Sequence, residues 1–178
     1  TSVQSIVSRN VSAFDSAVVT IGEVSAGNTW NVIPDSARIQ GTVRTFKEEM
    51  RDLVEEEMER IVKGTCLAAN VDYVFEYHRG YPPLVNHKEE TEFIAEVAKT
   101  VPGVDTVKET PPRMGGEDFA YYLQHVKGAF IYTGAGNPEW EVTYPHHHPK
   151  FKFDERVLLT TSKTLGAATL ETLSSNKA

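Results

Sequence analysis

The chain has 178 residues, with 25 acidic against 18 basic side chains, a formal net charge of −7 and 40% hydrophobic residues. This apolar content excludes a disordered tail, and the acidic balance argues against a general nucleic-acid binder, which would carry a basic patch. The length allows one domain or two small ones. The apolar runs are far shorter than the roughly 20 residues that a membrane span needs.

The first half predicts one small α/β unit. β-branched residues over 17–24 predict a strand, and strict alternation over 37–44 predicts a second, half-buried strand. Thr45-Phe46-Lys47-Glu48 has the spacing of a capping box, and we expect its helix to stop at Gly64. Alternation over 71–77 predicts a third strand. With a partial helix at the start, this order is that of a ferredoxin-like βαββαβ sandwich lacking its first strand.

The second half is predicted to begin at a break, Gly80-Tyr81-Pro82-Pro83, which divides the chain into domains 1–80 and 81–178. We expect helices over 88–99, 117–124 and 154–173, the last capped by Asp154, and strands over 104–107 and 129–132. The run at 129–132 is apolar throughout, as in a strand covered on both faces. This half does not supply the neighbours that such a strand needs, so they must come from another segment or chain.

The termini and the single cysteine bear on the compartment. Thr1 opens directly into helix-spaced apolar residues, with no initiator Met and no signal-peptide layout, which indicates a truncated or processed product. One cysteine, Cys66, cannot form an internal disulfide. We expect Cys66 to be a minor core residue and the protein to be cytoplasmic.

The densest candidate site is His146-His147-His148, which holds three of the six histidines. It lies on a loop over 133–152 that follows a predicted buried strand, and sites collect at the carboxyl ends of such strands. Neighbouring side chains on an extended loop point to opposite sides, so we expect one imidazole to bind metal. One ligand cannot complete a zinc site. The alternative is a solvated polar loop; a purification tag is disfavoured because the run is short, internal and bracketed by prolines.

Two further candidates point to an anionic substrate. Gly115 and Gly116 precede a predicted helix, where backbone can approach a ligand closely, although the acids that follow them are equally able to cap that helix. Arg44 lies on the polar face of its strand and could hold a carboxylate through two hydrogen bonds, while the Asn31 amide could polarise a carbonyl. The alternative for these two is an ordinary surface arginine and a turn-forming asparagine. The acidic run at 55–57 is interpreted as a solvated helix face.

Four motifs together resemble a known family: Asn31-Val32-Ile33-Pro34-Asp35, Gly41-Thr42-Val43-Arg44-Thr45-Phe46, Gly115-Gly116-Glu117-Asp118-Phe119 and His147-His148-Pro149-Lys150-Phe151. They occur in the same order in the dinuclear-zinc aminoacylase/carboxypeptidase superfamily. The branch concerned contains hippurate hydrolase, bacterial N-acyl-amino-acid amidohydrolases and plant auxin-conjugate hydrolases. The resemblance spans nearly the whole chain.

The resemblance implies a catalytic α/β domain with two divalent metals and an inserted ferredoxin-like lid that often mediates dimerisation. Residues 1–80 would form most of the lid, and residues 81–178 the C-terminal portion of the catalytic domain. His147 matches a late metal ligand, and Asn31 and Arg44 match lid residues that hold the substrate's carbonyl and carboxylate, in some relatives across the dimer. Gly115 and Gly116 match the loop lining the substrate pocket. The metals would be zinc, with manganese, cobalt or nickel as alternatives.

The expected function is therefore part of a metal-dependent amidohydrolase that cleaves N-acyl amino acids or small peptide-like amides with metal-activated water. The family's other metal ligands and its general base have no match here. We expect the isolated chain to be inactive, with no catalytic residue of its own and weak metal binding, and to form a homodimer through the lid. The alternatives are a non-catalytic dimerisation fragment acting through an exposed strand edge and a ferredoxin-like small-molecule sensor. Neither nucleic acid nor membrane is an expected partner.

Overall fold

The computed structural model describes residues 1–175, which fall into two compact units. The first unit comprises Thr1–Leu84 and Pro112–Tyr121, and the second comprises Val85–Pro111 and the chain from Tyr122 onward. The elements in chain order are η1 (Ile6–Asn10), β1 (Ala17–Ala26), β2 (Ala37–Thr45), α1 (Glu48–Ala69), α2 (Lys88–Thr100), α3 (Phe119–Leu123) and α4 (Arg156–Ser175). None of these helices is long and apolar enough to cross a membrane.

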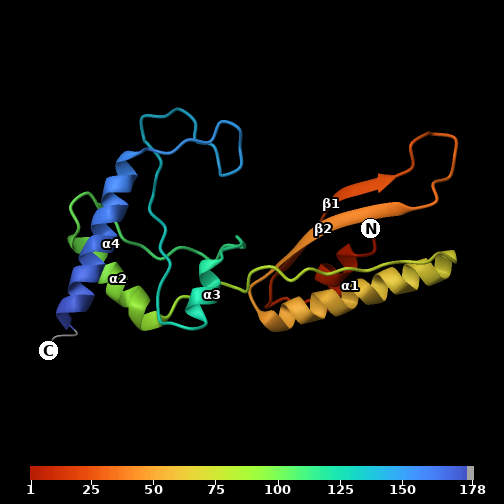
Figure 1. Ribbon diagram of the computed structural model, residues 1–178, viewed down its shortest axis with the longest axis horizontal. Helices are drawn as coiled ribbons and strands as arrows, with labels where there is room; N and C mark the ends of the chain where they lie inside the picture. Colours follow the sequence, from red (N-terminus) through yellow and green to blue (C-terminus); the bar gives the residue numbers. More distant parts are fainter. Residues whose placement is uncertain (176–178) are drawn as a thin grey trace. The chain divides into compact units, whose positions relative to one another are not determined.

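The first unit is built on an antiparallel hairpin of β1 and β2, which lies along α1 (Figure 1). The pairing runs from Ala17 with Thr45 at the base to Ala26 with Ala37 near the loop, so both predicted strands are confirmed. The register shifts between Ile21 and Glu23, which is a β-bulge in β1. The alternating pattern that predicted β2 therefore continues along the whole ladder.

The core of the first unit lies at the base of the hairpin. Ile6 of η1 and Val54 of α1 are fully buried, and Ala17 and Val19 of β1 complete the buried cluster. The partly buried residues packed against it are Val3, Val7, Val11, Val43, Met58 and Ile61. Toward the loop, where β1 and β2 extend past this cluster, apolar side chains become exposed.

Both predicted ends of α1 are wrong. Thr45 pairs with Ala17 in the ladder, so its backbone is extended and the helix begins at Glu48, with no side-chain cap on Lys47. The helix continues through Gly64 and ends at Asn70, which adopts a left-handed φ of 55°. The next N–H group, that of Val71, donates to the Cys66 carbonyl at 3.0 Å, which closes the helix end.

The predicted strand over 71–77 is extended backbone but forms no ladder with the described residues. Its alternation survives in the burial pattern, because Phe75 and Tyr77 are half-buried with ring centroids 6.4 Å apart. In a βαββαβ sheet the returning strand pairs with the first strand. This prediction failed because that hydrogen-bonding partner is missing from the sheet.

The second unit packs α2 against α4, and both predicted helices are confirmed. Asp154 caps α4 as expected, because its Oδ1 accepts the Arg156 N–H at 3.0 Å. Side-chain and backbone hydrogen bonds from Arg156 lower the pKa of the Asp154 carboxyl to about 2. α3 is shorter than the helix predicted over 117–124.

The predicted strands over 104–107 and 129–132 are not formed. In place of a neighbouring strand, the Asn86 side chain donates to the Phe130 carbonyl at 2.9 Å and accepts the Phe130 N–H at 2.8 Å. The His87 N–H donates to the Gly128 carbonyl at 3.1 Å. The apolar run is extended as expected, but two residues before α2 take the place of the strands that would complete a sheet.

We expect Gly41→Ala to destabilise the first unit by about 1–3 kcal/mol, the usual range for overpacking. A Cβ at Gly41 would lie 2.3 Å from the Thr20 carbonyl oxygen, which belongs to the paired strand and cannot move without disturbing the ladder. Gly64→Ala is the matched control. Its Cβ meets nothing within 4 Å inside a helix, so it should stabilise by about 0.5–1 kcal/mol. Urea denaturation of the three proteins measures both effects, and equal midpoints for Gly41→Ala and the unsubstituted chain would contradict the prediction.

Candidate functional site

Arg44 offers an unpaired guanidinium at the base of the hairpin. It pairs through its backbone with Val18, and its side chain is exposed. Among the described residues it forms no ion pair and no side-chain hydrogen bond. Four other arginines, Arg51, Arg60, Arg79 and Arg156, each pair with a carboxylate. Arg44 is therefore free to bind an external carboxylate through both of its terminal nitrogens.

Gly116 lies directly against Arg44 in the same unit. A Cβ at Gly116 would be 3.2 Å from Nη1 of Arg44 and 3.5 Å from Cδ2 of Tyr81, whereas a Cβ at Gly115 would meet nothing within 4 Å. The Tyr81 ring makes an edge contact with Tyr121 at 5.9 Å. The structure thus brings together the predicted Arg44 and Gly116 and leaves backbone accessible beside the cation.

Tyr81 is a neighbour of this site that sequence reasoning missed. It lies in the Gly80-Tyr81-Pro82-Pro83 break, where the glycine and prolines indicate a boundary and the aromatic residue carries no periodic signal. Its contact with Gly116 joins segments far apart in the chain. No spacing along the sequence reports such a contact, so only the folded unit reveals it.

The structure does not bring Asn31 to Arg44. Asn31 lies in the loop beyond the Ala26–Ala37 pair, while Arg44 lies one pair from the opposite end of the ladder. The Asn31 Oδ1 accepts a hydrogen bond from the Thr29 hydroxyl at 2.9 Å. Its neighbour Trp30 is 95% exposed. One hairpin therefore cannot present both side chains to the same small ligand.

In the second unit, the three histidines differ in how far their rings are engaged. His146 makes an edge contact with Phe151 at 4.7 Å. His148 stacks on Tyr144 at 4.3 Å, and its Nδ1 accepts the Lys150 N–H at 3.0 Å. His147 has a left-handed φ of 68°, and no ring contact or hydrogen bond holds its imidazole within the described part of the chain. The geometry thus leaves one imidazole of the three available.

A complete metal centre is not assembled by the described residues, because nowhere among them do three or more His, Cys, Asp or Glu side chains gather closely enough to hold an ion. His147 belongs to the second unit, and the other predicted site residues belong to the first. The donor type of His147 suits zinc, but the number of donors does not. No reaction step can therefore be assigned to a metal held by this chain alone.

The profile of Peptidase family M20/M25/M40 matches residues 5–171. The chain belongs to this family. The predicted superfamily is thereby confirmed, and the four motifs that carried the resemblance lie within the matched M20/M25/M40 region.

Two curated relatives of this M20/M25/M40 chain come from Bacillus subtilis (strain 168). One is YhaA, a provisionally named amidohydrolase, which is 47% identical over 169 residues, 95% of this chain and 43% of YhaA. The other is N-acetyl-L-cysteine deacetylase, 37% identical over 175 residues, 98% of this chain and 40% of the deacetylase. The chain spans about two fifths of the length of these relatives.

Two solved structures resemble the M20/M25/M40 chain closely. A provisionally assigned aminohydrolase from methicillin resistant Staphylococcus aureus has a TM-score of 0.80 and 38% identity, over 96% of this chain and 43% of that one. A Bacillus subtilis structure described as a dinuclear metal binding peptidase of the M20 family has a TM-score of 0.71 and 36% identity, over 89% and 42%. The predicted fold class, a partial ferredoxin-like lid followed by the C-terminal piece of an α/β catalytic domain, is confirmed.

Proposed function

We propose that this chain forms the carboxylate-binding part of a metal-dependent amidohydrolase that cleaves N-acyl amino acids or small peptide-like amides. The unpaired guanidinium of Arg44 beside Gly116 is the observation that carries the proposal. An N-acyl amino acid has both a carboxylate and a scissile amide, and N-acetyl-L-cysteine, named for one relative, is of this class. The family match supports hydrolase chemistry in the longer enzyme, which we place in the cytoplasm.

The proposed roles follow from the chemistry of each group. Arg44 holds the substrate carboxylate with two charge-assisted hydrogen bonds, and Gly115 and Gly116 allow the substrate to lie close to the backbone. The Asn31 amide stabilises the oxyanion that develops on the scissile carbonyl. Because Asn31 and Arg44 lie toward opposite ends of one ladder, we assign the Asn31 that serves a given site to a second copy, in a homodimer formed through the lid.

His147 would supply one ligand to a pair of divalent metals, with the other donors located outside the described residues. The M20 structure described as dinuclear and metal binding supports this assignment, as does the free imidazole of His147. We favour zinc, with manganese, cobalt or nickel as alternatives. When bound, such metals lower the pKa of water and polarise a carbonyl. The chain alone should neither hold both metals nor hydrolyse amides.

The second candidate function is a non-catalytic dimerisation module. It is favoured by the exposed apolar side chains of the hairpin loop, where Trp30 is 95% and Ile33 91% exposed. Such a module would form the same oligomer with and without metal. Size-exclusion chromatography in zinc and in chelator tests this, because the enzyme reading predicts that substrate turnover depends on metal.

A hybrid enzyme gives the direct test. Residues 5–171 of this chain replace the matched region of YhaA, and hydrolysis of a panel of N-acetyl amino acids is measured with added metal. We expect the hybrid to hydrolyse the panel and the isolated chain to be inert. Turnover by the purified chain alone would refute the proposal, as would a hybrid that binds two metals yet hydrolyses nothing that YhaA hydrolyses.

Gly116→Ala in the hybrid should raise KM for N-acetyl amino acids by roughly 3–10-fold, the loss of about one ordinary hydrogen bond. The added Cβ would crowd Nη1 of Arg44 at 3.2 Å, and the flexible guanidinium would move a few tenths of an ångström from its best position. Gly115→Ala is the control, since its Cβ meets open space. Equal KM values for the two variants would show that Gly116 does not position Arg44.

A further inference from the structure

The hairpin has an unpaired edge on β2. The described residues form a two-stranded sheet, so β2 pairs with β1 on one side and has no ladder partner on the other. The outward N–H and C=O groups of β2 therefore lack sheet partners. Unpaired edges are templates for another strand, and native proteins cover or shorten them.

A second unpaired backbone runs along the same unit. After β2 and the crossover through α1, residues 71–79 return as extended chain alongside α1, in the same direction as β2 (Figure 1). A strand–helix–strand crossover places its two strands in one sheet. Because no ladder joins residues 71–79 to β2, the arrangement is that of two parallel strands separated by one absent strand. Such a gap corresponds to two strand spacings, about 9–10 Å.

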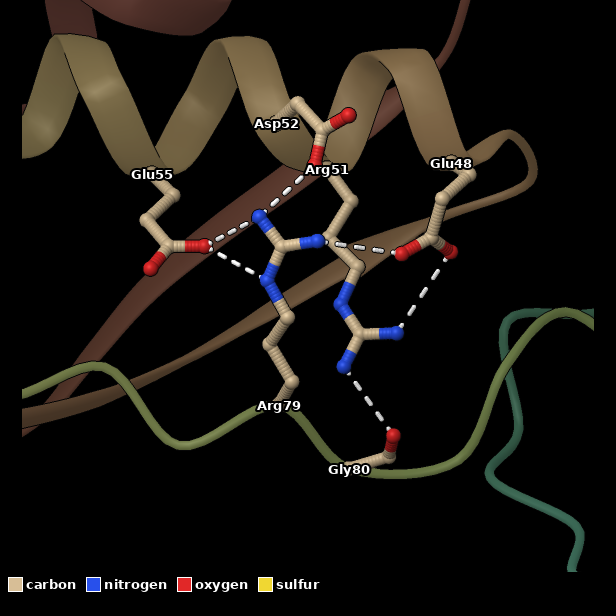
Figure 2. A network of polar contacts seen from close by, with 6 residues as sticks. All are labelled: Glu48, Arg51, Asp52, Glu55, Arg79 and Gly80. Carbon is tan, nitrogen blue, oxygen red and sulfur yellow. Dashed lines mark hydrogen bonds and ion pairs between the residues drawn. The ribbon is translucent and has the colours of Figure 1, made fainter.

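Ion pairs hold the returning segment in place (Figure 2). Arg79 pairs with three carboxylates on one face of α1, those of Glu48 at 3.1 Å, Asp52 at 2.6 Å and Glu55 at 2.5 Å. Hydrogen bonds from Asp52 and Glu55 raise the pKa of Arg79. Arg51, next in the same row, donates to the Gly80 carbonyl at 3.0 Å. The end of the segment is therefore fixed on α1 although its own backbone has no ladder.

We propose that β2 and residues 71–79 are the two walls of a slot that takes one extended polypeptide strand, supplied by the part of the longer M20 enzymes that lies outside the matched region. About three fifths of the length of these relatives lies outside the match, so polypeptide is available to fill it. Recognition is by β-augmentation, in which main-chain hydrogen bonds to both walls provide the affinity. The α1 carboxylates nearby are already neutralised by Arg79, so the slot does not select a cation.

The topology also fixes the direction and pattern of the incoming strand. A strand that leads through η1 into β1 by a right-handed crossover is parallel to β1, and hence antiparallel to β2 and to residues 71–79. Its alternate residues share the face of β2 that carries Val43, which packs against the core cluster containing Val54. The occupant is thus a strand of alternating apolar and polar residues.

An N-terminal extension tests the slot on the full chain. The probe is a seven-residue strand of alternating valine and threonine joined to Thr1 by a Gly-Ser linker, since Gln4 is bonded to the Val19 carbonyl at 2.9 Å and so lies on the hairpin. Hydrogen exchange should slow at least about 100-fold at the outward amides of β2 and within residues 71–79. The matched control replaces the valines by prolines, which cannot form the ladder. Unchanged exchange with the valine extension would overturn the proposal.

Two further measurements identify the occupant and the role of the clamp. In full-length YhaA, the segments matching 37–45 and 71–79 should both be protected, and free exchange of the latter would overturn the proposal. Arg79→Ala should reduce the protection gained by the extended chain at least tenfold, while Arg60→Ala, which breaks a pair with Glu57 on the same helix, should not. Protection of the unextended chain that rises with its concentration would show a second copy in the slot and would contradict the assigned source. None of these readouts depends on catalysis.

Discussion

Replacing Arg44 with alanine in the hybrid enzyme is expected to lower kcat/KM for N-acetyl amino acids by about 100–1,000-fold. A bidentate arginine–carboxylate pair contributes two charge-assisted hydrogen bonds, together worth about 3–4 kcal/mol, and each 1.36 kcal/mol is a factor of ten. No carboxylate among the described residues competes for the Arg44 guanidinium, so its whole hydrogen-bonding capacity is available to the ligand. Steady-state kinetics on the hybrid measures the loss.

Three comparisons separate carboxylate binding from general damage. Arg44→Lys keeps the charge without the planar fork and should recover only part of the activity. Arg38→Ala, on the same polar face of β2 but at the far end of the ladder, should change kcat/KM less than about twofold, as expected for an isolated surface site. The Arg44 effect should also shrink for N-acetyl amino acid amides, which lack the carboxylate. An equal loss on acid and amide substrates would mean that Arg44 supports the fold and not the ligand.

His147→Ala should reduce the metal content of the hybrid from two ions to one or fewer and lower kcat at least about 100-fold, since even weakening a ligand's support costs 10–100-fold. The imidazole of His147 is held by no described neighbour, so its removal leaves the loop packing intact. Elemental analysis of the purified hybrid, alongside circular dichroism, separates metal loss from unfolding.

The neighbouring histidines are the controls for this prediction. His146 packs on Phe151 and His148 stacks on Tyr144, so alanine at either position should loosen the loop yet leave both metals bound. Thermal melting should show a small loss of stability for these two variants. If either control loses metal while His147→Ala keeps it, the ligand has been assigned to the wrong member of the run.

Local periodicity predicted the elements that local interactions build. The strands over 17–24 and 37–44 were found, as were the bodies of α1, α2 and α4. The segments at 71–77 and 129–132 failed because a strand is defined by hydrogen bonds to a neighbour, and no pattern within the segment reports whether that neighbour is present. The end of α1 was misjudged at Gly64 because a helix tolerates one glycine and because Asn70 supplies the left-handed turn equally well.

The candidate site was predictable as residue types but not as an assembly. The free guanidinium of Arg44 follows from its place on the polar face, and the single available imidazole follows from the geometry of a loop. The contact of Gly116 with both Arg44 and Tyr81 joins three distant segments, so only the folded unit reveals it. Likewise, the motif that contains Asn31 gave no sign that the hairpin would hold it away from Arg44.

The single extra residue in β1 acts as a phase correction for the whole hairpin. Val19 and Ile21 face the same side as Val43 and Gly41, and after the bulge Val24 faces that side together with Ile39, although their parity along β1 has changed. One surface of the ribbon therefore stays apolar from end to end. Removing Gly22 would invert the outer half and turn its greasy side over, so the aim of the hairpin loop is governed by the length of β1 counted to a single residue.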